Sequence, residues 1–481
     1  MSMDKLDVAR IRPPQSVLGL LPPRVARGLG ALPVSVAPDG AVTVCVSDAT
    51  DFALRDRLER LLEGRAVRFA EAGDPTAFAA ALRENYPDAA LNGTLDRPEE
   101  LFAYMLRRAL ARGASDIHVS PDERGSRIRL RVDGRLVTDR REPPEAAAEF
   151  VSYIKVQAKL DIAERRAPQD GNIDTELDGA TVSLRVATVP TLYGEHVTLR
   201  LLSQTARTQK LERLEDLGMH SEAFALFRKA LRAPNGVIII SGPTGSGKTT
   251  TLYAALRALA APDDRHLVSI EDPVEKPVAG VTQIKVDGRQ ERVSFAKALR
   301  SVLRHDPDVV MVGEVRDGET AATALRSALT GHLVLTTLHT NSAPAILTRL
   351  TDLGVPPYLV AGTLRLAMAQ RLVRRPCPAC VDWAPATPEE CAACGWDATR
   401  PPKIPHAKGC PYCGGTGYAG RTAVYEMLPV DDAARDALMA GRPPTIADPA
   451  LTLRGDGLRK VLEGETTLDE IADVIDNELL T

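Results

Sequence analysis

The stretch GVIIISGPTGSGKTTTLYAAL, residues 236–256, decides the fold of this chain. An uninterrupted apolar run, Val237 to Ile240, leads into a loop with the pattern G-x-x-x-x-G-K-T, and helix-forming residues follow it. Strand, loop and helix in this order are the context in which such a loop binds phosphate. Its glycines allow backbone N–H groups to approach phosphate oxygens, and the N-terminal end of the helix adds positive partial charge. The sequence therefore predicts a nucleotide-binding P-loop at the end of a buried strand.

The residues expected to hold the nucleotide form one continuous segment, with ATP and Mg²⁺ as the predicted cofactors. In such loops the lysine, here Lys248, reaches the β- and γ-phosphates, and the next hydroxyl, here Thr249, ligates Mg²⁺. The segment consists of Gly242, Pro243, Thr244, Gly245, Ser246, Gly247, Lys248, Thr249 and Thr250. A degenerate loop that binds nucleotide without hydrolysing it is the alternative interpretation.

Hydrolysis also requires an acid near the terminal phosphate. DPDVVMVGEVRD, residues 306–317, places Glu314 after an apolar run, and LVSIEDPVE, residues 267–275, places Glu271 at the end of another. A carboxylate at a strand end beside a P-loop can hold Mg²⁺ through water or orient the attacking water. The spacing does not decide between the two acids. His339, which follows the apolar run LVLTTL, is a weaker candidate for contact with the γ-phosphate.

The composition is that of an ordinary globular protein, with 44% hydrophobic and 26% charged residues among 481. This length predicts about three domains. The formal net charge of −4 argues against a generally basic nucleic-acid binder. The N-terminal segment MSMDKLDVARIRPPQ lacks the apolar core of a secretory signal, and no run of about 18 uncharged apolar residues occurs. A cytoplasmic protein is expected.

Four segments lead up to and through the P-loop. Residues 1–90 predict a small α/β module, because VSVAPDGAVTVCVSD alternates around a Pro-Asp-Gly turn as a hairpin does. Residues 91–205 predict an α+β domain, and residues 206–234 a linker and an entry helix. In residues 235–375 short apolar runs alternate with helical patterns, which is typical of a mostly parallel sheet.

Two arginines mark the predicted second domain. In TVSLRVATVP and HVTLRLL, Arg185 and Arg200 lie opposite the apolar residues of their strands. Their guanidinium groups are therefore expected on the exposed side of the sheet. A solvated sheet face explains them as well as a functional role does.

Six of the seven cysteines lie between residues 377 and 413, as three C-x-x-C pairs. Such clustering in an unexported protein indicates metal binding, and four thiolates would form a closed structural zinc site. Local spacing favours Cys391 and Cys394 with Cys410 and Cys413, because fifteen residues separate these two pairs. A redox-active pair is the alternative.

In combination these motifs resemble the family of type II secretion and type IV pilus assembly ATPases. Its Walker A, Asp box, Walker B and His box motifs are similar to GPTGSGKTTTLYAAL, SIEDPVE, DPDVVMVGEVRD and TGHLVLTTLHTNSA. The domain that precedes the ATPase core in this family is similar to GASDIHVSP, RVDG, LDIAERRAPQDG and RVATVPTLYGE. The resemblance covers residues 15 to 430, roughly.

The resemblance implies a RecA-like P-loop ATPase core preceded by a PAS-like α+β domain and the small N-terminal α/β module. It further implies a zinc-binding insert at residues 376–420 and a C-terminal helical region at 421–481. A homohexamer would couple ATP hydrolysis to domain rotation, driving pseudopilus assembly and protein export by a type II secretion system. The N-terminal module would dock the cytoplasmic domain of an inner-membrane platform protein. This gives a peripheral location at the cytoplasmic face of the inner membrane, with no nucleic acid as partner.

The same resemblance assigns roles to single residues. Glu314 would be the catalytic acid, Glu271 would help to place water or metal, and His339 would contact the γ-phosphate. Arg185 and Arg200 would swing in from the preceding domain toward the γ-phosphate, as arginine fingers do. The flanking sequences QRLVRRPCPAC and GTGYAGRTAVYE select a zinc site of Cys377, Cys380, Cys410 and Cys413 in place of the one that spacing favours.

One position departs from the family pattern, and other functions compete. Asn172 stands in PQDGN where the family usually has arginine, so no role is carried over to it. A type IV pilus extension ATPase is the main alternative. A nucleic-acid translocase and a non-catalytic, nucleotide-binding scaffold are weaker ones, since aromatic residues make up only 4% of the chain and the P-loop is intact.

Overall fold

The computed structural model describes residues 5–6, 13–18, 20–21, 26, 29–37, 39–62, 65–86, 97–202, 213–286, 294–410, 413 and 415–474. The chain divides into two compact units. The first comprises Met1–Leu201, Cys377–Val381 and Ala407–Tyr418, and the second comprises Leu202–Pro376, Asp382–His406 and Ala419–Thr481. Within the described ranges, no helix combines the length and the apolar character needed to cross a bilayer.

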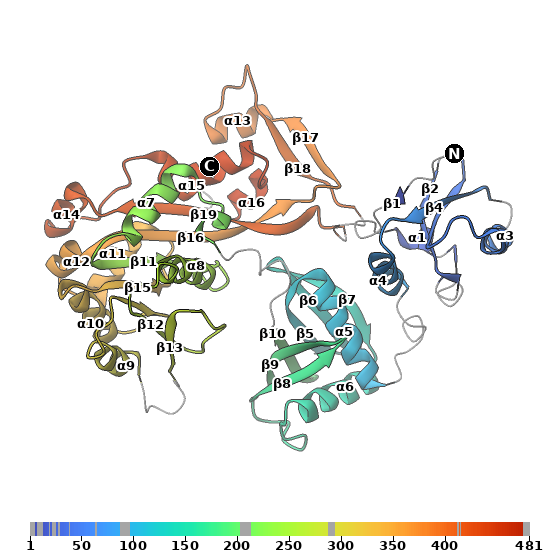
Figure 1. Cartoon of the computed structure of the whole chain (residues 1–481), viewed down its shortest axis with the longest axis horizontal. Helices are drawn as coiled ribbons and strands as arrows, with labels where there is room; N and C mark the ends of the chain where they lie inside the picture. Colours follow the sequence, from blue (N-terminus) through green and yellow to red (C-terminus); the bar gives the residue numbers. More distant parts are fainter. Residues whose placement is uncertain are drawn as a thin grey trace. The chain divides into compact units, whose positions relative to one another are not determined.

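The N-terminal part of the first unit is a small α/β module (Figure 1). Its sheet has the strand order β1-β4-β3-β2, and β2 and β3 form the predicted antiparallel hairpin. Asp51 accepts a hydrogen bond from the Leu54 N–H and so caps the helix that follows. The elements are β1 (Lys5–Leu6), α1 (Gln15–Leu18), β2 (Ala31–Val36), β3 (Val42–Val46), α3 (Phe52–Leu61), β4 (Val67–Ala72) and α4 (Pro75–Asn85).

The next domain packs two helices against a six-stranded sheet of order β7-β6-β5-β10-β9-β8. The apolar residues of the strands face these helices, whereas the arginine-bearing side does not. The predicted α+β character of this segment is therefore confirmed. Its elements are α5 (Pro98–Arg112), β5 (Ala114–Asp122), β6 (Gly125–Val132), β7 (Arg135–Glu142), α6 (Pro144–Gln157), β8 (Gln169–Leu177), β9 (Ala180–Thr191) and β10 (Gly194–Leu201).

The second unit is built on a seven-stranded sheet of order β13-β12-β14-β15-β11-β16-β19. From β13 to β16 neighbouring strands are parallel, as predicted. One face of the sheet is covered by α9, α10, α11, α12 and α14, and the other by η4, α7 and α8 (Figure 1). Strands buried on both faces explain why their sequences are continuous apolar runs.

The elements up to β15 are η4 (Leu214–Leu217), α7 (Ser221–Leu231), β11 (Gly236–Ser241), α8 (Lys248–Ala260), β12 (Leu267–Glu271), β13 (Val281–Lys285), α9 (Phe295–Val302), β14 (Val309–Val312), α10 (Gly318–Leu329) and β15 (Leu333–Leu338). Those from α11 on are α11 (Ala343–Asp352), α12 (Pro357–Thr363), β16 (Leu364–Pro376), β17 (Val381–Pro385), α13 (Pro388–Cys394), β18 (Lys403–Ala407), β19 (Tyr418–Pro429), α14 (Asp432–Met439), η6 (Pro449–Leu451), α15 (Leu453–Leu462) and α16 (Leu468–Ala472).

The core sheet extends beyond the segment 235–375 in which the sequence placed it. Strand β19 spans the expected boundary at residue 420 and pairs with β16, and α14 packs in the same interior as α12. Both sides of β19 are buried, because Tyr425 and Met427 face one interior while Leu428 faces the other. The strand thus lacks the polar alternation that would have marked it in the sequence.

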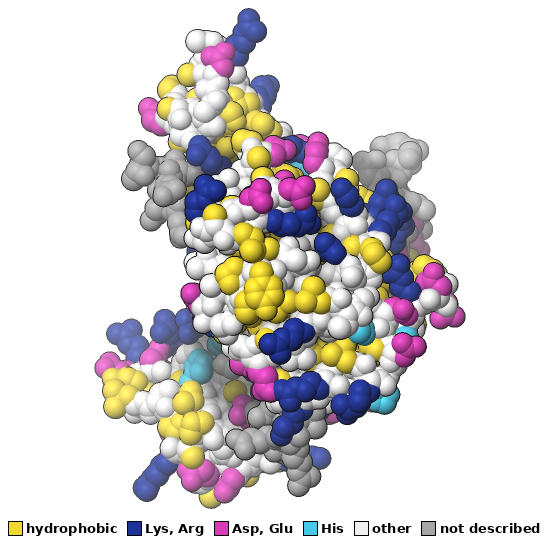
Figure 2. All heavy atoms as spheres, turned by 90° about the vertical axis from the view of Figure 1, so that its left-hand side faces the viewer, with side chains coloured by type: hydrophobic (Ala, Val, Ile, Leu, Met, Phe, Trp, Pro, Cys, Tyr) yellow, Lys and Arg dark blue, Asp and Glu magenta, His cyan; other side chains and the backbone are white. Residues whose placement is uncertain are grey.

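The face of the molecule in Figure 2 carries charges of both signs. Lys and Arg side chains are interspersed there with Asp and Glu side chains around a central group of hydrophobic side chains. Among its described residues this face thus resembles an ordinary mixed surface, in keeping with the formal net charge of −4.

Candidate active site and metal centre

The P-loop lies at the end of β11, which is flanked by β15 and β16. Gly242, Gly245 and Gly247 have φ values of 150°, 81° and 89°, which favour glycine. A Cβ atom on Gly242 would lie 2.4 Å from the backbone oxygen of Gln370, and one on Gly247 would lie 2.8 Å from Gln370 Nε2. The tight backbone of this loop therefore depends on glycine at both positions.

The polar groups of the loop fit a nucleotide phosphate with its Mg²⁺. Lys248 is buried, and its Nζ donates to the carbonyl oxygens of Gly242 and Pro243 at 2.6 and 3.0 Å. Desolvation lowers the pKa of Lys248, and the nearby charge of Glu314 opposes this shift. The buried Ser246 Oγ has no hydrogen-bond partner within the described part of the chain. A buried cation beside an unpaired hydroxyl suits an anionic ligand such as a phosphate.

Glu314 and His339 meet at the ends of neighbouring strands, β14 and β15. Glu314 Oε1 lies 3.2 Å from His339 Nε2, and Arg316 Nε donates to Glu314 Oε2 at 2.9 Å. Strand β14 pairs with β15, and Leu338 before His339 pairs with Ser241 before the P-loop, so the predicted acid and histidine lie at strand ends beside this loop. Arg316 was not predicted as a site residue, because nothing in the sequence distinguishes it from the many other arginines of the chain.

The two acids of the segment EDPVE occupy different environments. Glu271 is buried, and its carboxylate accepts hydrogen bonds from Tyr253, Ser269 and Gln283 at 2.5, 2.6 and 3.0 Å. These hydrogen bonds occupy both of its oxygens and hold it in the interior of the protein.

Glu275, four residues later, lies close enough to the side chain of Thr249 for that hydroxyl to affect the pKa of its carboxyl. Desolvation of its carboxyl raises the pKa of Glu275, as does the charge of Glu271, while the Thr249 side chain opposes them. Glu271 was predicted, with no preference over Glu314, because it ends an apolar run, and Glu275 was not among the predicted residues. The sequence signal that could have identified Glu275 is its place as the second glutamate of the segment EDPVE.

Arg185 and Arg200 lie directly opposite each other on β9 and β10, with Asn172 opposite Arg185 on β8. Like charges in this arrangement destabilise a sheet, and the carboxylate of Asp116 offsets them, because Arg200 Nε donates to it at 2.8 Å. Desolvation alone would raise the pKa of Asp116, but hydrogen bonds from Arg200 and Ser115 lower it. The two arginines belong to the first unit and the P-loop to the second, so their approach to nucleotide stays a prediction.

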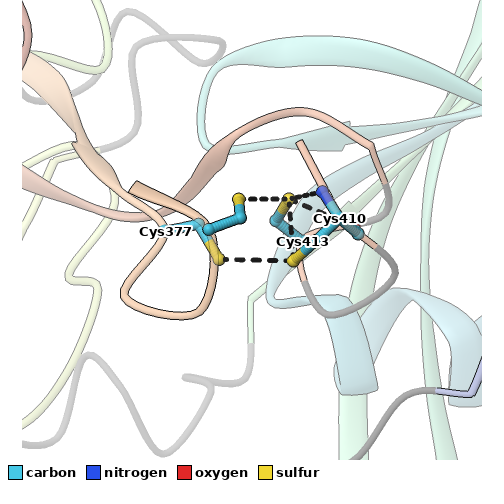
Figure 3. Close-up of side chains that lie close together, drawn as sticks. Cys377, Cys410 and Cys413 are labelled. Carbon is cyan, nitrogen blue, oxygen red and sulfur yellow. Dashed lines mark hydrogen bonds between the residues drawn. The ribbon is translucent and has the colours of Figure 1, made fainter. Parts of the chain in front are cut away.

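Four of the six clustered cysteines come together. The Sγ atoms of Cys377, Cys380, Cys410 and Cys413 all lie within 4.8 Å of one another. Figure 3 shows the Sγ of Cys377 facing that of Cys410. These two sulfur atoms lie 3.8 Å apart, and Cys413 Sγ lies 3.8 Å from Cys410 Sγ. Four sulfurs at about 2.3 Å from a tetrahedral zinc ion are themselves about 3.8 Å apart. These residues therefore fit zinc, and they are the set that the family resemblance selected.

Backbone groups prepare one of these thiols for the metal. The N–H groups of Cys410 and Gly417 each donate to Cys413 Sγ at 3.1 Å. Desolvation would raise the pKa of Cys413, but these donors and the neighbouring thiols lower it to about 6. Burial raises the pKa of Cys377 to about 12. Metal ligation needs all four as thiolates, and a bound cation supplies the missing stabilisation.

Cys391 and Cys394 lie elsewhere, on the short helix α13. Cys391 is fully buried and packs with Val373, Ile404 and Ile471 in a small hydrophobic core. The spacing-based pairing of Cys391 and Cys394 with the last pair is therefore not what the structure shows. The spacing rule fails because it does not see that α13 buries both thiols, with Cys391 in this core.

We expect the double variant Cys391→Ser/Cys394→Ser to keep about one zinc ion per chain, since neither thiol belongs to the cluster. Its melting temperature should fall, because a buried apolar thiol is replaced by a hydroxyl. Metal counting by atomic emission checks the first point and calorimetry the second. Loss of zinc from this variant would contradict the assignment.

The motif resemblance is confirmed by comparison with known proteins. The family described as Type II/IV secretion system protein matches residues 95–473, and the MshEN domain matches residues 2–90. Type II secretion system protein E of Pseudomonas aeruginosa is 40% identical, with 93% of this chain and 96% of that protein covered. Type II secretion system ATPase E of Vibrio cholerae is 42% identical over 78% of this chain and 75% of that protein. Type IV pilus assembly ATPase PilB of Thermus thermophilus is 38% identical, covering 96% of this chain but 51% of that protein.

Solved structures agree with this assignment. The pilus retraction motor PilT with bound ADP matches with a TM-score of 0.51 at 25% identity, covering 77% of this chain and 96% of that one. The ATPase DotB of Legionella pneumophila matches with a TM-score of 0.56 at 22% identity, covering 79% and 96%, and so shares the fold. With its P-loop, its cluster of four cysteines and these relatives, the chain belongs to the family of type II/IV secretion system proteins.

Proposed function

We propose that this chain is the ATPase of a type II secretion system. The observation that carries the proposal is the gathering of Lys248, Thr249, Glu275, Glu314 and His339 around one P-loop. It is supported by relatives named as ATPases of such systems that align along most of their length. A pilus extension ATPase is the second candidate, favoured by the likeness to PilB. The type II candidate is supported by coverage, because this chain covers 96% of the Pseudomonas aeruginosa protein but 51% of PilB.

In the proposed mechanism each group has one task. Lys248 and the loop N–H groups bind the phosphates of ATP, and Thr249 would hold Mg²⁺, which neutralises charge on those phosphates when bound. Glu275 orients the attacking water, since Glu271 is occupied by internal hydrogen bonds and Glu314 by His339 and Arg316. His339, held by Glu314, contacts the γ-phosphate.

The remaining parts of the proposal concern assembly. Arg185 and Arg200 approach the γ-phosphate when the domains close, and release on hydrolysis allows rotation between them. The working form is a homohexamer at the cytoplasmic face of the inner membrane. It is held there by the N-terminal module, which docks the cytoplasmic domain of a platform protein. Zinc at the four-cysteine cluster is a structural cofactor, because four thiolates leave no position for water.

Phosphate release from ATP tests this function. We expect the rate per subunit to rise at least about tenfold over the concentration range in which light scattering detects assembly. This increase is smaller than the contribution that an arginine supplied by a neighbouring subunit or domain can make to kcat. The reason is that the arginines must be brought to the site by closure and by neighbouring subunits. An unassembled chain that hydrolyses ATP as fast as the assembled one would contradict the proposal. So would equal rates for the assembled wild type and its Glu314→Gln variant.

A further inference from the structure

Glu426 on β19 is a buried carboxylate that joins the N-terminal ends of two helices. Its Oε1 accepts a hydrogen bond from the N–H of Ala343 at 2.7 Å, and its Oε2 accepts one from the N–H of Leu453 at 3.3 Å. Ala343 is the first residue of α11, and Leu453 is the first residue of α15. Unpaired N–H groups and positive partial charge at helix N-termini both favour a carboxylate at this place.

Each helix also has an ordinary cap of its own. Ser342 Oγ accepts from the Ala345 N–H at 3.3 Å, and Thr452 Oγ1 accepts from the Gly455 N–H at 3.0 Å. Capping one helix does not require a side chain from β19. What Glu426 adds is a fixed distance between the two helix ends, through two charge-assisted hydrogen bonds in the interior.

The α11 side of this link leads to the nucleotide site. Only a short segment separates His339 from Ala343. Within this segment the backbone carbonyl oxygen of Asn341 accepts a hydrogen bond from Arg371 Nη2 at 2.7 Å. The charge of Arg371 also acts on Lys248 and lowers its pKa. The segment that carries His339 is thus held at its far end by Glu426 and in its middle by Arg371.

The α15 side leads to the entry of the ATPase core. Lys460, two turns into α15, is fully buried, and its Nζ donates to the carbonyl oxygen of Gly218 at 2.6 Å and to that of Ala423. Tyr425, next to Glu426 on β19, donates its hydroxyl to Leu217 O at 2.8 Å. Leu217 and Gly218 close the short helix η4, which lies within the segment predicted as linker and entry helix, residues 206–234.

We propose that Glu426 is a positioning residue for ATP hydrolysis. It holds the segment that carries His339 at a fixed position relative to α15, and through α15 relative to the start of the core. The inference rests on the proposed function. Glu426 does not touch nucleotide, and its effect passes through α11 and the segment before it. Loss of the link loosens the position of His339 against the phosphate without changing the P-loop.

The test compares two isosteric variants in the assembled protein, Glu426→Gln and Glu470→Gln. Glutamine keeps the size of the side chain but turns an NH₂ group toward one of the two N–H donors of Glu426. Glu470 on α16 is the matched control, since it is as buried and accepts from the Arg374 N–H at 2.8 Å and from Nε at 3.0 Å. Both variants lose a buried charge-assisted contact, but only Glu426 is linked to the nucleotide site.

We expect Glu426→Gln to lower kcat about tenfold with little change in KM, because a small displacement of a catalytic group acts on the chemical step. Glu470→Gln should keep kcat within about twofold of the wild type at a comparable loss of melting temperature. In the His339→Ala background Glu426→Gln should have little further effect on kcat. Equal kcat values for the two glutamine variants, or additive losses with His339→Ala, would overturn the proposal.

Amide hydrogen exchange provides a readout that does not depend on hydrolysis. Exchange of residues 340–345 should speed up in Glu426→Gln and stay unchanged in Glu470→Gln, and unchanged exchange in both would also overturn the proposal. A wild-type chain without ATPase activity would refute the proposed function instead. The exchange measurement would then still decide whether Glu426 holds this segment.

Discussion

Glu275→Gln is expected to lower kcat about a hundredfold, the usual contribution of a positioned general base. The carboxylate lies close to Thr249, whose side chain affects its pKa, so it is near the place where an attacking water beside the γ-phosphate would be oriented. Glutamine keeps the shape and can still accept from Thr249, but it cannot take up a proton. Nucleotide affinity should therefore change little. Steady-state phosphate release gives kcat, and the fluorescence of a labelled ATP analogue gives affinity.

The matched control is Glu271→Gln, four residues earlier. Its carboxylate accepts three internal hydrogen bonds, from Tyr253, Ser269 and Gln283, and the variant should cost about 1–3 kcal/mol of stability. Its kcat should fall far less than that of Glu275→Gln. If Glu271→Gln abolished hydrolysis and Glu275→Gln did not, the water-positioning role would return to Glu271, as the family resemblance first implied.

Removal of zinc is expected to unfold the segment around the four cysteines while the P-loop core persists. Apparent zinc binding energies in small zinc-dependent folds are about 10–16 kcal/mol at pH 7, and the segment has few apolar contacts to replace them. Cys410→Ser should lose the metal and become sensitive to trypsin at Lys408, two residues before the altered ligand. Metal counting and mass spectrometry of the digest measure the two effects.

Nucleotide affinity is the control for this experiment, because the hydrophobic clusters around the P-loop contain none of the four ligands. A Cys410→Ser chain that keeps its zinc, or that resists trypsin as well as the wild type does, would show that the cluster is not a metal site. A chain that lost nucleotide binding along with zinc would show that the two parts fold as one.

The P-loop core could be predicted from the sequence because its signals are local. The loop, its lysine and the runs at β11, β14 and β15 are each read from fewer than twenty neighbouring residues, which is the range over which periodicity is informative. Glu275 was not predicted because its proximity to Thr249 joins two separate segments and cannot be read from spacing. Spacing also does not show that Glu271 is the buried acid of this motif and Glu275 the exposed one.

Contacts between segments that are distant in the sequence could not be predicted either. Strand β19 was missed as a strand of the core because burial on both sides hides its alternation. Spacing alone selects the wrong cysteine pairs, since 15 residues lie between Cys394 and Cys410 but 29 lie between Cys380 and Cys410, outside the usual range. The flanking sequences of the family settled it, and the geometry agrees.

The four-cysteine cluster has a consequence for how this part of the chain can change over generations. Cys377 and Cys410 are 33 positions apart, yet their sulfurs meet at 3.8 Å where β16 has just ended and shortly before β19 begins. Because the cost of closing a loop grows only with the logarithm of its length, a cross-link at its base makes additions beyond it inexpensive. The geometry of the ATPase sheet therefore does not depend on the length of the segment between β16 and β19. Selection can lengthen, shorten or replace its tip, as it does the tips of surface loops, without altering the strand order on which hydrolysis depends.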